Sequence, residues 1–159
     1  MTTIYGAILK RGEKYYTYLQ KVFDAINNRQ MEYNWLITDC ECLPESPGLK
    51  SLFFQEYCFL SGDELTDIIK QEDFQWIWAV LSGFKKDIPF DEIMKYPLPY
   101  ANGYEGFWKN PLSIQHPLAS IEIVPWDSSL TLVLSEDKSI VDSYRSAFPL
   151  SYDLTEYNK

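Results

Sequence analysis

Positive charge is scarce in this sequence, and that scarcity limits its partners. The 159 residues include 14 Lys and Arg against 23 Asp and Glu, a net charge of −9. Residues 1–30 hold five basic and two acidic residues, whereas residues 31–159 hold nine basic and 21 acidic residues. Most of such a chain would repel a phosphate backbone or an anionic membrane surface. We therefore expect neither nucleic acid nor membrane as a partner, and the charge favours a basic protein.

Residue types that carry catalysis or hold metals are also few. The chain has three cysteines, Cys40, Cys42 and Cys58, and one histidine, His116. An odd number of cysteines without disulfide-like spacing is typical of a reducing compartment, so we expect a cytoplasmic protein. On a strand, Cys40 and Cys42 would share one face. Their spacing is shorter than structural zinc prefers and no second pair follows, so we expect no metal and no cofactor.

Nucleophile motifs are missing around His116. The sequence has no Gly-x-Ser-x-Gly turn and no cysteine-protease signature, so a triad of nucleophile, histidine and acid has no local support. His116 precedes Pro117, which forces an extended backbone at the histidine. We interpret His116 as a loop histidine that bonds to the main chain, and we predict no catalytic residue.

Long apolar runs are missing as well. No segment reaches the ~18 apolar residues of a membrane span, and residues 1–6 lack the basic flank and apolar run of a signal peptide. The chain is instead a globular mixture with 46% apolar residues and 16% aromatic residues. That aromatic content requires burial or a binding surface. We expect one domain over residues 1–159.

Hydrophobic periodicity and turn signals predict alternating strands and helices. Strands are expected at 4–9, 33–37, 53–60, 74–81, 119–124 and 130–134. Helices are expected at 13–28, from Ser61, and from Ser135 to Phe148, with a short turn at 90–95 and a polar, fraying tail at 150–159. This order implies a two-layer α+β fold: a mixed or antiparallel sheet of five to six strands, with three main helices mostly on one face.

The run from Phe74 to Leu81 is the most hydrophobic of the predicted strands. Both of its alternating faces are apolar, which is typical of a central strand covered on both sides. We therefore expect Ile77 and Trp78 to be buried on opposite faces of that strand.

Several short motifs resemble a known family. They are the strands Tyr33–Ile37 and Phe74–Leu81, the helix starts Leu60–Leu65 and Glu136–Lys138, and the turn Asp127–Ser129. Together they resemble an uncharacterised bacterial family of small proteins with a domain of unknown function, common in Gram-positive spore-forming bacteria. The resemblance implies one cytoplasmic α+β domain and brings no catalytic residue to this chain.

A proline-stiffened segment at 96–108 is rich in aromatic residues and is the main candidate for binding. Rigid aromatic side chains with polar tips are typical of binding hot spots. The same loop could instead fold back and cover the central strand. Loops of this length usually pack on something, and we favour that interpretation. Both interpretations, binding site and cover, hold if the tyrosine hydroxyls stay exposed.

Acidity, small size and aromatic content together favour a binding protein without catalysis. Its most concrete version is an immunity-type inhibitor of a basic toxin. The alternative is a small ligand-binding domain or an enzyme that uses the segment 96–117 and His116. The candidate binding residues are Tyr96, Tyr100, Tyr104, Trp108 and His116.

Overall fold

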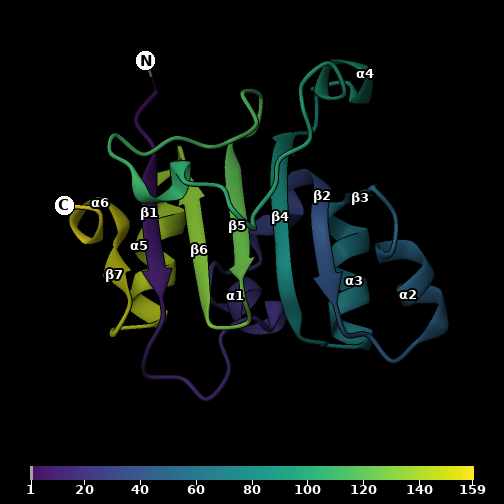
Figure 1. Ribbon diagram of the computed structural model, residues 1–159, viewed down its shortest axis with the longest axis horizontal. Helices are drawn as coiled ribbons and strands as arrows, with labels where there is room; N and C mark the ends of the chain where they lie inside the picture. Colours follow the sequence, from purple (N-terminus) through teal and green to yellow (C-terminus); the bar gives the residue numbers. More distant parts are fainter. Residues whose placement is uncertain (1) are drawn as a thin grey trace.

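Residues 2–159, which the computed structural model describes, are built around one seven-stranded antiparallel sheet (Figure 1). The strand order is β3-β2-β4-β5-β6-β1-β7, and every neighbouring pair is antiparallel. The strands are β1 (Tyr5–Leu9), β2 (Tyr33–Cys42), β3 (Tyr57–Ser61), β4 (Trp76–Lys85), β5 (Ile121–Trp126), β6 (Leu130–Ser135) and β7 (Tyr152–Asp153). Seven strands replace the five to six that we expected.

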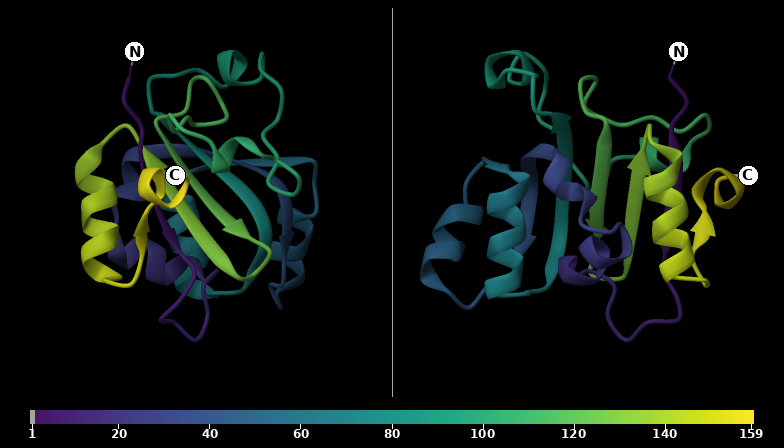
Figure 2. Two further views of the ribbon diagram at one scale, coloured as in Figure 1. Left: turned by 60° about the vertical axis from the view of Figure 1, so that its left-hand side comes forward. Right: turned by 180° about the vertical axis from the view of Figure 1, so that it is seen from behind.

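Helices cover one face of this sheet. Figure 2 shows α1, α3 and α5 together on the rear face, and α1 contacts both of the others. The helices of the described chain are α1 (Leu19–Ala25), α2 (Pro47–Phe53), α3 (Gly62–Gln71), α4 (Phe90–Ile93), α5 (Lys138–Ala147) and α6 (Leu154–Tyr157), with 3₁₀ turns η1 (Arg29–Glu32) and η2 (Gly106–Trp108). The α+β class is confirmed, but six helices replace the expected three. None of these helices has the length and apolar content needed to cross a membrane.

Three of the additional elements, α2, β7 and α6, come from two segments whose composition suggests irregular structure. Pro47 begins α2, because a proline at the first helical position lacks only an N–H that would be unpaired there. The tail expected to fray forms β7, which pairs with β1, and α6, whose Leu154 is fully buried. Leu154 is joined by Tyr152, which also packs against the smaller core, and by Tyr157, whose ring lies 6.3 Å from that of Trp108.

The start of α3 follows from its own residues. Ser61 accepts a hydrogen bond from the Glu64 amide at 3.1 Å, and the Glu64 carboxylate accepts one from the Ser61 amide at 2.9 Å. This reciprocal capping box satisfies two amides that helix geometry leaves unpaired. Gly62 follows because η1 passes so close that an added Cβ would collide with the Gln30 carbonyl oxygen.

Buried apolar side chains form three clusters, and the two largest lie on opposite faces of the sheet. The larger core, beneath the helices, contains the fully buried Trp35, Trp76 and Tyr144. The smaller core contains Phe107 and Leu132, and the segment that follows α4 crosses over it on the front face in Figure 1. The loop therefore covers part of the sheet face that the helices leave open.

β4 is the central strand that the sequence predicts, because it lies between β2 and β5. Its pairing with β2 skips Ile77: Glu41 lies opposite Trp78, and Cys42 lies opposite Trp76. This bulge interrupts the alternation of faces, so Trp76 enters the larger core while Ile77 and Trp78 are only half-buried. The prediction that both would be buried is wrong.

Candidate binding surface

Buried polar side chains line the sheet face that carries the smaller core. Thr38 on β2, Ser82 on β4 and Glu122 on β5 share this face, and Ser82 lies directly opposite Glu122. All three are almost completely buried, and each has a side-chain oxygen with no protein partner within residues 2–159. Such oxygens carry a desolvation cost, so this row departs from ordinary core packing.

Glu122 is the ionisable member of that row. Its Oε2 accepts a hydrogen bond from the Gln115 amide at 3.1 Å. Burial raises the pKa of the carboxyl to about 8, because the charged form loses its hydration. Burial also raises the pKa of the Tyr104 hydroxyl, with a smaller contribution from the charge of Glu122. At neutral pH the carboxyl therefore keeps its proton.

Side-chain hydrogen bonds fix the loop main chain above this row. Asp39 Oδ2 accepts from the amides of Ala101 at 2.8 Å and Asn102 at 3.2 Å. The Gln115 side chain accepts from the Tyr100 amide at 3.0 Å and donates to the Tyr100 carbonyl at 2.9 Å. Residues 100–102 are thus held by β2 on one side and by the end of their own loop on the other.

His116 secures the far end of the segment. Its Nδ1 accepts from the Leu118 amide at 3.1 Å, so Nε2 carries the proton and donates to the Ile93 carbonyl at 2.9 Å. Burial lowers the pKa of the ring, which favours the neutral form. Both ring nitrogens are occupied by the main chain, as the sequence interpretation predicted. His116 holds α4 and the loop together.

Two of the predicted binding residues face solvent. The side chains of Tyr96 and Tyr100 are 37% and 48% exposed. The Tyr96 ring lies 5.1 Å from the His116 ring, and the Tyr100 ring meets Tyr104 edge to face at 5.3 Å. Each tyrosine is therefore supported from one side and open to solvent on another.

The other two predicted aromatics turn inward. Tyr104 packs edge to face on Phe107 at 4.7 Å, and Trp108 packs the same way on Trp126 at 5.8 Å. Both contribute to the smaller core. The segment 96–108 therefore covers the sheet with one half and exposes tyrosines with the other.

A second aromatic group lies on the same face of the sheet. Phe90 of α4 is exposed and packs on Phe59 at 4.9 Å and on Tyr57 at 6.1 Å. β3, which carries Tyr57 and Phe59, is the outermost strand, and its outer edge pairs with no strand in the described chain. Sequence reasoning missed this group, although the two-residue spacing of Tyr57 and Phe59 places both on one face.

Two hollows adjoin the loop. One of about 590 Å³ lies between residues 2–4 and 111–119, and His116 lines it. The other, of about 490 Å³, has Lys10, Trp108, Trp126 and Tyr157 among its lining residues. Glu122 lines neither, so the histidine and the buried carboxyl do not meet in one cavity. Across residues 2–159 no cluster of three or more His, Cys, Asp or Glu side chains could hold a metal ion.

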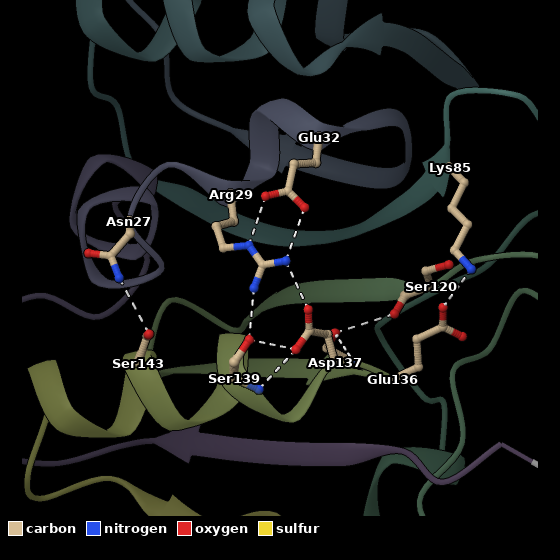
Figure 3. A network of polar contacts seen from close by, with 10 residues as sticks. Asn27, Arg29, Glu32, Lys85, Ser120, Glu136, Asp137, Ser139 and Ser143 are labelled. Atoms are coloured by element: carbon tan, nitrogen blue, oxygen red, sulfur yellow. Dashed lines mark hydrogen bonds and ion pairs between the residues drawn. The ribbon is translucent and has the colours of Figure 1, made fainter.

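A polar network around Arg29 joins η1 to α5 (Figure 3). The guanidinium donates to Glu32 at 2.8 and 3.0 Å, to Asp137 at 2.8 Å and to Ser139 at 2.8 Å. Asp137 also caps α5 by accepting from the Ser139 amide at 3.0 Å, and Ser135 in turn accepts from the Asp137 amide. Hydrogen bonds from Ser139, and then from Arg29, lower the pKa of Asp137. The network is structural. We call it the η1–α5 clasp, because the bonds of Arg29 hold η1 against the start of α5.

These observations define a class of α+β protein: an antiparallel sheet with helices α1, α3 and α5 on one face and, on the other, an ordered loop that exposes tyrosines. Residues 4–98, more than half of the chain, match the family described as protein of unknown function (DUF2691). The chain belongs to that family, which confirms the resemblance to an uncharacterised family; an origin in spore-forming bacteria stays a prediction. Searches of curated proteins and of solved structures found no match.

Proposed function

We propose that the protein is a non-enzymatic binding domain that presents its exposed aromatic side chains to a basic protein. The observation that carries this proposal is the pairing of exposure with rigidity in one loop. Tyr100 is 48% exposed, yet its main chain is bonded on both sides by Gln115. A loop whose main chain is already fixed loses little conformational freedom on binding, so more of its contact energy becomes affinity.

Charge supports a basic partner. The chain carries a net charge of −9, and exposed carboxylates accompany the aromatic groups. Asp91 follows Phe90 in α4, and Glu105 follows Tyr104 in the loop. Acidic groups around aromatic anchors attract a basic surface during encounter, while the anchors slow dissociation.

An immunity-type inhibitor of a basic toxin or nuclease is the specific form of this proposal. Such an inhibitor must bind tightly with a preformed surface, and it acts in the cytoplasm, the compartment that the cysteine content favours. His116 and Glu122 support a role without catalysis, because the first is bonded to the main chain through both ring nitrogens and the second is sealed under the loop.

The test compares an exposed tyrosine of the segment 96–108 with an exposed tyrosine outside it. The partner is captured from the native host, purified, and its binding to the protein is followed by surface plasmon resonance. Tyr100→Ala should weaken binding by about 2 kcal/mol or more, roughly thirtyfold in Kd, mainly through faster dissociation. Tyr15→Ala is the matched control, because Tyr15 is 49% exposed and lies outside the loop. It should leave binding unchanged.

Electrostatic steering is tested on the same complex. Asp91→Asn combined with Glu105→Gln should slow association and flatten its salt dependence, with little change in dissociation. A partner that is acidic, or binding that is indifferent to salt, would contradict the charge argument. If Tyr100→Ala leaves Kd unchanged in a folded protein, the loop is only a cover for the sheet.

A small ligand is the second candidate, supported by the hollow of about 490 Å³ whose walls include Trp108, Trp126 and Tyr157. Aromatic walls with Lys10 at one side suit a flat ligand that carries an anionic group. A screen of aromatic carboxylates by tryptophan fluorescence tests this function. Quenching that Lys10→Ala abolishes would favour it over protein binding.

A further inference from the structure

Two cysteine thiols lie side by side at the end of β2. Cys40 Sγ and Cys42 Sγ are 3.7 Å apart, within hydrogen-bond reach for sulfur. Both side chains contact the larger core, so they share one strand face as the sequence predicts. Cys40 is half-buried, whereas Cys42 is only 4% exposed. One thiol of the pair is therefore accessible to reagents, and the second lies directly behind it.

The backbone at this point is free on one side. β3 pairs with β2 only as far as Thr38, so residues 39–42 have β4 as their one neighbouring strand in the described chain. Asp39 adopts a positive φ of 49°, and the register with β4 shifts around Glu41. A bulged strand end that pairs on one side can adjust more easily than a strand paired on both.

The thiols also differ electrostatically from the third cysteine. A hydrogen bond from Cys40 lowers the pKa of Cys42, and the same bond, together with burial, raises the pKa of Cys40. Cys42 therefore loses its proton first, and the proton of Cys40 can then pass to Cys42 along the S–H···S bond, which leaves the thiolate on Cys40. Burial raises the pKa of Cys58 to about 12, so it stays a thiol.

We propose that Cys40 and Cys42 form a redox-active dithiol that small disulfide compounds oxidise to an intramolecular disulfide. The thiolate at the accessible Cys40 attacks one sulfur of the compound and releases its first thiolate, which leaves a mixed disulfide. Cys42 then gives its proton to solvent, attacks the Cys40 sulfur and displaces the second thiolate. Two protein thiols and one small disulfide become one protein disulfide and two small thiols.

The competing explanation is that the two cysteines are simply small side chains that pack together. The stoichiometry of their reaction with a disulfide reagent distinguishes this explanation from a dithiol. The full-length protein is treated with dithiobis(nitrobenzoate) under native conditions, and released thionitrobenzoate and intact mass are measured together. A dithiol should release two equivalents per chain, lose the mass of two hydrogens and retain no nitrobenzoate. Cys58→Ser should behave like the wild type. Cys42→Ser should release one equivalent and retain one nitrobenzoate on Cys40.

Two outcomes would overturn the proposal: a wild-type protein that retains the nitrobenzoate adduct, or thiols that react only after denaturation. A second measurement covers the case in which Cys42→Ser does not fold. Phenylarsine oxide binds thiols in pairs with loss of water, so prior treatment of wild type or of Cys58→Ser should block release of both equivalents. Unchanged release after that treatment would also refute the dithiol.

Discussion

Glu122 places an ionisable group between the sheet and its covering loop, out of contact with water. Its pKa rises from an ordinary value of 4.5 to about 8 in the folded chain. Between these values the unfolded chain releases the proton and the folded chain keeps it. The folded state then holds more protons, so the free energy of unfolding falls as the pH rises through that window. Below the window both states are protonated, and the contribution of Glu122 does not change.

Glu122→Gln should remove this dependence, since the amide keeps the shape of the carboxyl and does not ionise. Urea unfolding of wild type and variant from pH 4.5 to 8 measures it. The variant should gain stability relative to wild type as the pH rises, by a few kcal/mol at most, given ~1.4 kcal/mol per pKa unit. Glu105→Gln, at an exposed site, serves as control. A difference between Glu122→Gln and wild type that is constant across the range would contradict the assignment.

Arg29 and Lys138 both form ion pairs, and they should differ in energetic importance. Arg29→Met removes every guanidinium bond of the η1–α5 clasp and leaves Asp137 and Glu32 without their cation. We expect a loss of about 1.5–3 kcal/mol in the free energy of unfolding, the range for hydrogen bonds to charged groups. Lys138→Met breaks only an exposed pair with Asp142 and should cost under about 0.5 kcal/mol. Equal losses measured by chemical denaturation would show that the clasp adds nothing.

Single residues also show where sequence reasoning stops. Glu122 alternates with Ile121 and Ile123, and a period of two assigns such a glutamate to solvent. It is buried because the loop that precedes β5 folds back over that face, which the alternation within the strand cannot show. His116 was predictable, since a proline directly after it restricts the backbone and favours a role in the loop.

At the scale of elements, the segment 96–118 is ordered largely without regular secondary structure. Its shape is fixed by side chains that bond to main chain at both ends: Asp39 and Gln115 near Tyr100, and His116 between Ile93 and Leu118. Few hydrogen bonds fix this long segment. The loss of one of them should therefore lower the stability of the protein more than the loss of one hydrogen bond in a helix.

His116→Ala removes one buried and one partly buried hydrogen bond and leaves a cavity beside Phe84, whose ring lies 4.8 Å from the imidazole. We expect a loss of roughly 2–4 kcal/mol in the free energy of unfolding. Hydrogen exchange followed by mass spectrometry should show faster exchange at the Leu118 amide. Ser113→Ala, an exposed change in the same segment, should alter neither quantity. Unchanged exchange at Leu118 in the histidine variant would mean that the loop is held by other contacts.

Elements whose signals are local were predicted well. The capping box before α3 and the hairpin of β5 and β6 depend on residues close together in the sequence. The break of alternation at Ile77 was not predictable, because it depends on which residues of β2 lie opposite. The aromatic loop was expected to cover the sheet, but the inward and outward directions of its rings follow from the sheet beneath it.

For the molecule as a whole, the C-terminal tail completes one end of the sheet. Leu154 lies in the smaller core and close to Gly6, so its side chain joins the tail to β1. Leu154→Ala should lower the free energy of unfolding by about 2–5 kcal/mol in urea denaturation. Leu150→Ala removes the same atoms from a side chain that is 48% exposed and should cost much less. Similar losses for both would mean that the tail packs only loosely.

The place of β1 in the sheet has a consequence for how the chain is made. β1 is synthesised before the other six strands, yet Tyr5 lies opposite Ser135 and Ala7 lies opposite Asp153. Until β6 has been synthesised, β1 has no neighbouring strand, and β3, β2 and β4 can assemble only as a separate three-stranded ribbon. The nascent protein must keep β1 unpaired until β6 has been synthesised, and the β5–β6 hairpin then joins the two parts into one sheet.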